Sequence, residues 1–110
     1  MAYKYDRVIL TAADLVRLWY FRAQTDDIQF QVFFDATALS EGATFKVEES
    51  FYPDDATMWR TLNQNVTQNR TFPPVDGRVA ALRFTVAGLT LGTIRIGLSY
   101  DEDSDEAQEN

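Results

Sequence analysis

Apolar and polar residues alternate with a period of two along most of the chain, which predicts a protein built almost entirely of β-strands. In the clearest run, four apolar residues fall on one face: Ile28, Phe30, Val32 and Phe34. Successive side chains of a strand point to opposite faces, so these four are expected in a core. Phe33 falls on the opposite, polar face, which makes it a candidate contact residue.

Further runs of the same kind predict about seven or eight short strands in all. They cover residues 7–10, 15–21, 44–50, 58–62, 66–72, 79–86 and 91–99. The run 66–72 is the most polar and is expected at a sheet edge. Helix is expected for at most one turn, near residues 11–14 or 54–58. The spacing predicts an all-β, antiparallel β-sandwich, jelly-roll-like or immunoglobulin-like.

The length of 110 residues favours one domain, because two cores of half this size would each be marginal. We expect the sandwich domain in residues 1–100 and a disordered acidic tail in residues 101–110. That tail holds six of the seventeen acids and no base, so the body before it is nearly neutral although the net charge is −7. This charge distribution disfavours nucleic acid as a partner.

Neither an anchor nor an export segment is expected. No apolar run approaches the roughly 20 residues that cross a bilayer, so no membrane partner is predicted. Residues 1–7 also lack the apolar stretch of a signal peptide. The chain is therefore expected to be made in a cytoplasm and to stay soluble there at first.

Cysteine and histidine are both absent, which excludes Ser-His-Asp and Cys-His catalysis and imidazole or thiolate metal sites. Glu48 and Glu49 are neighbours on a predicted strand and point to opposite faces, so they are not expected to form a catalytic carboxylate pair. The acids Asp101, Asp103 and Asp105 resemble the start of a calcium loop, but no glycine follows at the sixth position. We expect no catalytic residue, cofactor or metal.

Aromatic residues offer one candidate binding site. Tyr52, Trp59 and Trp19 could form a platform on which a sugar ring stacks. The competing interpretation, which we favour, is that Trp59 closes the core at the end of its strand. Tyr52 lies in the turn signalled by Pro53 and is the better candidate for an exposed contact.

Arginine accounts for eight of the ten bases, and several arginines fall on outward strand positions. The planar guanidinium is enriched at protein interfaces. Arg60, Arg83 and Arg95 are accordingly candidate interface residues, together with Arg17 and Arg22. An arginine-bearing sheet face beside acidic loops favours a homo-oligomer with charges paired between subunits.

Four segments together resemble small β-sandwich structural proteins of tailed bacteriophages: residues 43–50, Trp59 to Leu62, residues 79–86 and residues 94–96. In that family a strand ends in Ser, a turn follows, and Trp-x-x-Leu begins the return strand. The resemblance covers residues 27–99. The chain departs from it at residues 51–56, where a longer loop replaces the usual Asp-Gly turn.

The resemblance implies a virion component, namely a capsid decoration (cement) protein or a head or tail accessory protein. Such a protein would bind capsid or other virion proteins and stabilise the assembled particle. We therefore expect a homo-oligomer, with a trimer favoured, located in the virion. The alternative is a carbohydrate- or receptor-binding β-sandwich module, in which Tyr52 and Trp59 would contact a glycan.

Overall fold

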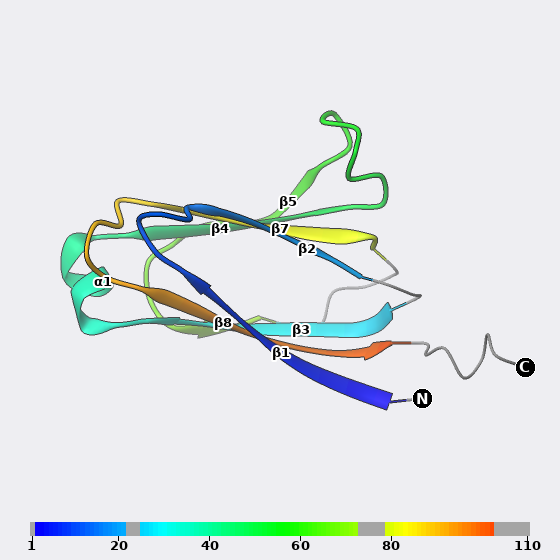
Figure 1. Cartoon of the computed structure of the whole chain (residues 1–110), viewed down its shortest axis with the longest axis horizontal. Coiled ribbons are helices and arrows are strands. Elements are labelled where there is room, and N and C mark those ends of the chain that lie inside the picture. The colour runs from blue at the N-terminus through cyan, green and yellow to red at the C-terminus, as the bar shows by residue number, and fades with distance from the viewer. Residues whose placement is uncertain (1, 22–24, 73–78, 103–110) are drawn as a thin grey trace, which may run out of the picture.

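The chain forms two antiparallel sheets packed face to face (Figure 1). The computed structural model describes residues 2–21, 25–72 and 79–102. In these residues the first sheet has the strand order β1-β8-β3-β6 and the second β2-β7-β4-β5. The strands are β1 (Ala2–Leu10), β2 (Val16–Tyr20), β3 (Thr25–Phe34), β4 (Thr44–Ser50), β5 (Arg60–Val66), β6 (Arg70–Thr71), β7 (Ala81–Ala87) and β8 (Ile94–Glu102). The predicted all-β antiparallel sandwich is confirmed.

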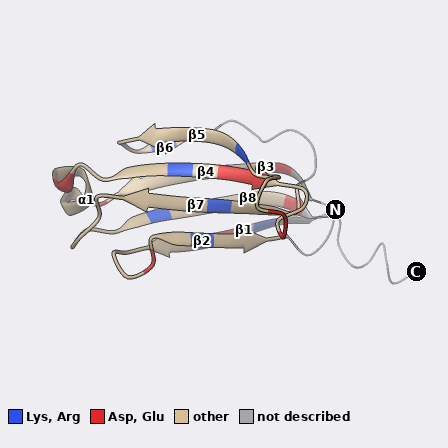
Figure 2. Cartoon of the chain, turned by 90° about the horizontal axis from the view of Figure 1, so that it is seen from above, with Lys and Arg blue, Asp and Glu red and all other residues tan. Residues whose placement is uncertain are grey.

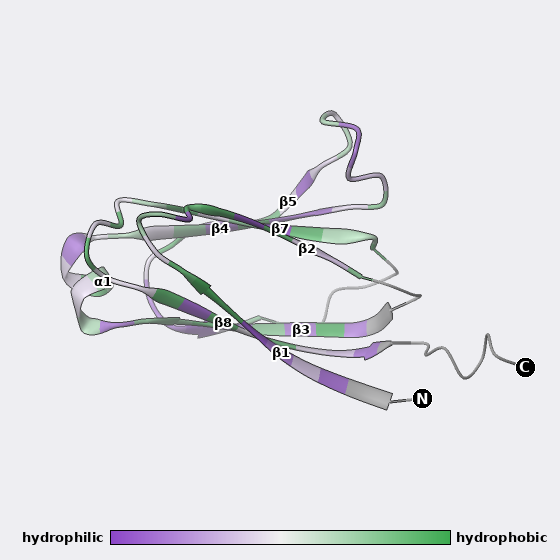
Figure 3. Cartoon of the chain, in the orientation of Figure 1, coloured by the Kyte–Doolittle hydropathy of each residue, from purple (hydrophilic) through white to green (hydrophobic). Residues whose placement is uncertain are grey.

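The core lies between the sheets and is formed by the faces that the alternation predicts. Ile28, Phe30, Val32 and Phe34 of β3 are all buried, and Figure 3 shows hydrophobic and hydrophilic segments alternating along the strands. Phe30 joins the two layers, because its ring stacks on Phe72 at 4.5 Å and meets the edge of Phe84 of the second sheet at 6.1 Å. Close aromatic packing of this kind makes the sandwich one cooperative unit.

Several predicted strand boundaries were wrong. The strand expected at 58–62 begins at Arg60 and continues to Val66, and its pairing with β4 is irregular at two points. Of the run 66–72, Val66 is the last residue of β5, and Arg70 and Thr71 form β6 at the edge of the first sheet, as expected. β8 begins at Ile94 and not at residue 91, because the residues before it form a loop bound to Glu41.

The expected location of helical structure was also wrong. A short helix, α1 (Ala36–Glu41), follows β3 directly. It begins at Asp35, whose side chain accepts a hydrogen bond from the Ala38 amide at 2.7 Å, and it ends at Gly42 with φ 71°. A capping aspartate and a left-handed glycine suffice to define a helix of this length.

The boundary of the acidic tail differs from the prediction as well. β8 extends to Glu102, and Asp101 is buried within it, so the ordered domain includes two residues that were assigned to the tail. Residues 103–110 lie outside the described residues. Among the residues that are described, no helix is long and apolar enough to span a membrane.

Two carboxylates hold the end of the sandwich near α1. Asp35 accepts hydrogen bonds from the Thr93 amide and hydroxyl, both at 3.0 Å, in addition to its helix cap. Glu41 accepts hydrogen bonds from three successive backbone amides, those of Thr90, Leu91 and Gly92. Hydrogen bonds from backbone amides hold the pKa of both carboxyl groups below the ordinary range.

Candidate interaction surfaces

The outer face of the first sheet carries three rows of side chains across the neighbouring strands β1, β8 and β3, which form the lower layer in Figure 1. The register places Gly97 in the middle of the middle row, between Arg7 of β1 and Gln31 of β3. The flanking rows, each in the order β1, β8 and β3, are Tyr5, Ser99 and Gln29 on one side and Ile9, Arg95 and Phe33 on the other.

A hollow of about 480 Å³ opens on this face because the central position has no side chain. A Cβ atom added to Gly97 would meet no atom within 4 Å. Tyr5 (76% exposed) and Phe33 (39% exposed) both line the hollow. They stand at diagonally opposite ends of the three rows, Tyr5 on β1 and Phe33 on β3. Sites for small ligands have volumes of roughly 300–1,000 Å³, so this hollow has a suitable size.

The hollow is richer in cationic than in anionic groups. Among the described residues, neither Arg7 nor Arg95 forms an ion pair with a carboxylate, although Arg95 stacks on the Phe33 ring at 5.8 Å. Asp6 also lines the hollow, and its Oδ2 accepts a hydrogen bond of 2.6 Å from the Tyr100 hydroxyl. Two guanidinium groups are therefore available to a ligand.

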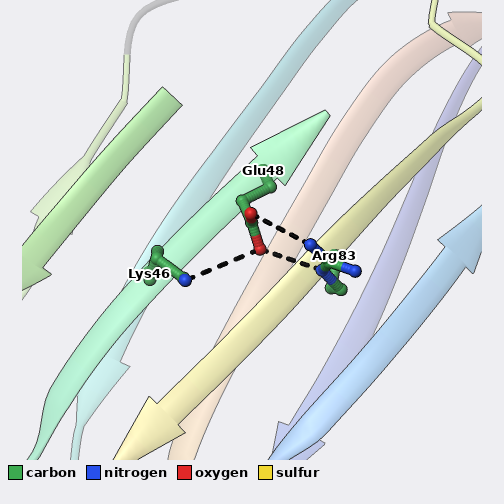
Figure 4. Close-up of polar contacts among 3 residues, drawn as sticks. All are labelled: Lys46, Glu48 and Arg83. Carbon is green, nitrogen blue, oxygen red and sulfur yellow. Dashed lines mark hydrogen bonds and ion pairs between the residues drawn. The ribbon is translucent and has the colours of Figure 1, made fainter. Parts of the chain in front are cut away.

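The outer face of the second sheet carries a cluster of paired charges instead. Figure 2 shows basic and acidic segments of β4 and β7 next to each other, and Figure 4 shows Glu48 between Lys46 and Arg83. Arg83 binds Glu48 through two hydrogen bonds, at 2.9 and 3.0 Å, and its guanidinium stacks on the Trp59 ring at 4.3 Å. The Arg83 hydrogen bond holds the pKa of Glu48 below its ordinary value.

Glu49 has a separate arginine partner. Its Oε2 accepts a hydrogen bond of 2.9 Å from Nε of Arg60, which lies opposite it on β5. Neither carboxylate of the Glu48–Glu49 dipeptide shares its arginine with the other. The Glu49 and Glu48 pairs are thus two structural ion pairs within the chain.

A third surface is the apolar stripe on β2, which consists of Val16, Leu18 and Tyr20. These three alternate residues are 51%, 41% and 53% exposed. Their partners on β7 include Thr85 and Arg83, so the stripe lies on the outer side of the second sheet. Exposed apolar residues gathered on one face are typical of an interaction site.

The loop between β4 and β5 presents further exposed apolar side chains. It projects away from both sheets in Figure 1, and Phe51, Tyr52 and Met58 line an open hollow on it. Trp59 does not line this hollow. The expectation that Trp59 closes the core was also wrong, because its ring lies against Arg83 and it is not among the residues that pack in or against the core. Trp19 packs against the core. The structure thus does not bring Tyr52, Trp59 and Trp19 into one aromatic platform.

The six predicted contact residues divide among these surfaces. Phe33 and Arg95 lie together in the hollow over Gly97. Trp59 and Arg83 lie together beside Glu48, whereas Arg60 pairs with Glu49 and Tyr52 belongs to the projecting loop. The prediction missed Tyr5 and Gly97. A glycine at an outward position inside a strand is a signal that could have indicated the hollow.

The arginines expected to pair between subunits are largely paired within the chain. Arg17, Arg60 and Arg83 each bind a carboxylate of the same chain. Arg22 lies outside the described residues. Arg95 is the remaining one of the five arginines predicted on the outward sheet face. Among the described residues it has no carboxylate partner.

Comparison with known proteins identifies the fold but no family. No model of a known protein family matches the chain, and no curated protein matches its sequence. The core of the Drosophila protein NLP, whose structure is described as giving insight into pentamer formation and histone binding, is similar with a TM-score of 0.60 and 17% identity. The match covers 94% of this chain and 100% of that one.

A mutant of a family 29 carbohydrate-binding module is also similar, with a TM-score of 0.43 and 17% identity over 86% of this chain and 61% of that one. At 17% identity and a TM-score of 0.60, the similarity to the NLP core shows a shared fold and nothing more. Function has to be argued from the surfaces themselves.

Proposed function

We propose that this protein is a non-enzymatic structural protein, which forms a homo-oligomer and stabilises a larger protein assembly by binding to it. The assembly that the sequence favours is a virion, with the protein acting as a capsid decoration or accessory component. The observation that carries the proposal is the apolar stripe on β2.

β2 lies at the edge of the second sheet and pairs only with β7 among the described strands. An edge strand exposes unpaired backbone groups, and natural proteins usually protect such edges with charge or proline. β2 carries one charged residue, Arg17, which already pairs with Asp14 at 3.0 Å. An apolar outer face and an open edge on one strand favour contact with a second protein.

A second copy of the chain is the first partner to consider. The NLP core, which shares this fold across nearly the whole chain, is described in terms of pentamer formation. This supports a closed ring for the present protein too, although the sequence itself favoured a trimer. If this oligomer binds only the assembled particle, it stabilises the particle by mass action, because the separate subunits of the particle offer no complete binding site.

The oligomeric state tests the first half of the proposal. Size-exclusion chromatography with light scattering should give a discrete closed oligomer for the full chain. Leu18→Asp combined with Tyr20→Asp places two charges in the stripe and should give a monomer with an unchanged circular dichroism spectrum. The matched control is Leu91→Asp, since Leu91 is exposed in the loop before β8 and lies outside the stripe.

The second half is tested on particles. If the chain is a virion component, it should co-sediment in a density gradient with virions purified from cells that produce it, and the monomeric variant should be lost from them. A monomeric wild-type protein, or virions that lack the chain, would contradict the proposal.

A further inference from the structure

We propose that the hollow over Gly97 binds an acidic saccharide, a short chain of pyranose rings that carries carboxylate groups. This site lies on the first sheet, away from the apolar stripe on β2. It is therefore independent of the proposed oligomer and adds a ligand to the protein-binding role.

The shape of the hollow indicates an elongated ligand that lies flat on the sheet. Its floor is the backbone at Gly97, and nothing stands within 4 Å of the missing side chain. Tyr5 and Phe33 are two rows and two strands apart, which corresponds to about 17 Å between their Cα atoms from ordinary strand spacings. This spacing suits a short oligosaccharide with an aromatic residue toward each end.

The neutral side chains of the hollow suit hydroxyl groups. Gln29, Gln31, Ser99 and Thr71 line it, and each can both donate and accept hydrogen bonds, as a sugar hydroxyl does. Nε2 of Gln31 donates to the Thr71 hydroxyl at 3.2 Å. This bond holds the Gln31 amide toward β6, and a side chain that is already oriented loses less entropy when a ligand binds.

The charges indicate an anionic ligand. The chain as a whole has a net charge of −7, yet Arg7 and Arg95 line the hollow without a carboxylate partner among the described residues. The acid in the same lining, Asp6, is already hydrogen-bonded to Tyr100. A guanidinium group binds a carboxylate through charge-assisted and often paired hydrogen bonds, so the two arginines favour a sugar that carries carboxylates.

An acidic peptide has the same charge but fits the site less well. Extended peptides are commonly recognised by main-chain hydrogen bonds to an open sheet edge. The hollow lies over β8, whose backbone is paired with β1 on one side and with β3 on the other. Side chains must therefore make the contacts, and the exposed ring of Tyr5 with four neutral polar groups matches a sugar better than a peptide backbone.

The test is an array that carries uronate- and sialate-containing glycans, the matching neutral glycans and a hexaglutamate peptide, probed with the 110-residue chain. Gly97→Val fills the hollow at a position where an added side chain meets open space. Arg7→Met and Arg95→Met each remove one positive charge. Arg17→Met is the matched control, because Arg17 is an exposed arginine on the other sheet.

We expect retention on at least one class of acidic glycan, with the matching neutral glycan bound at least tenfold more weakly. Gly97→Val should abolish this retention, each arginine variant should weaken it at least tenfold, and Arg17→Met should leave it unchanged. Retention should also fall as salt is raised. Lack of binding to every acidic glycan, equal binding of hexaglutamate, or binding that survives Gly97→Val would each overturn the proposal.

Discussion

Arg83 and Glu48 face each other on neighbouring strands and are joined by two parallel hydrogen bonds, at 2.9 and 3.0 Å. The Glu48 side chain is only 10% exposed, whereas that of Arg83 is 30% exposed and is covered on one side by Trp59. The pair links β4 to β7 in the middle of the second sheet. Its partial burial makes each partner depend on the other.

Replacing Arg83 with Met should destabilise the fold by about 1–3 kcal/mol, because Glu48 would remain buried without its main partner. The double variant Glu48→Met, Arg83→Met should lose less than the sum of the two single variants. Urea denaturation at neutral pH measures all three. Arg17→Met removes an exposed ion pair and should change stability by less than about 0.5 kcal/mol. An equal loss in both arginine variants would contradict this assignment.

Acid should loosen the end of the sandwich that holds α1. The pKa values of Asp35 and Glu41 are lowered in the folded chain, chiefly by backbone amides that donate to them. The unfolded state therefore binds more protons at low pH than the folded state does. The two carboxylates contribute fully to the free energy of unfolding above their ordinary pKa values of about 4, and this contribution is lost as pH falls through their lowered pKa values in the folded chain.

The measurement is the free energy of unfolding between pH 7 and pH 2. Asp35→Asn and Glu41→Gln should each flatten its decline at the acid end. Asp54→Asn serves as the control, because Asp54 is exposed in the projecting loop and lies away from α1. A decline that is as steep in the Glu41→Gln variant as in the wild type would exclude this role for Glu41.

Gly92 should tolerate no side chain. An added Cβ atom would lie 2.6 Å from the Cα atom of Ala38 and even closer to its backbone nitrogen, so the loop or α1 would have to move. Gly92→Ala is expected to cost about 2–4 kcal/mol. The neighbouring change Leu91→Ala should have little effect, since Leu91 is exposed. Thermal unfolding of both variants, followed by circular dichroism, distinguishes a local clash from general sensitivity of the loop.

Alternation predicted the fold correctly wherever burial alone decides which way a residue faces. The run from Ile28 to Phe34 is an example, because the period of two fixes the face on which each of its residues lies, whichever strands are its neighbours. α1 was missed because six residues are too few for a helical period, although Asp35 and Gly42 flank it as caps.

The candidate site was harder to predict because it depends on which strands are neighbours. Arg83 was predicted to face another subunit, but the pairing of β7 with β4 places it opposite Glu48. The hollow likewise requires Tyr5 and Gln31 to flank β8 across two different strand pairs. A sequence of alternating residues specifies faces and leaves sheet order open.

Gly97 gives the last prediction, which separates stability from binding. Glycine inside a strand is unfavourable because it loses more backbone freedom on folding and offers no side chain to pack. Val is favoured in strands, and at this position it would meet open space. Gly97→Val should therefore raise the free energy of unfolding by about 0.5–1 kcal/mol, seen as a higher urea midpoint with an unchanged slope. A gain in stability together with loss of glycan retention would mean that a stabilising side chain is omitted to keep the hollow open, whereas a destabilised variant would mean that Gly97 is required by the sheet itself.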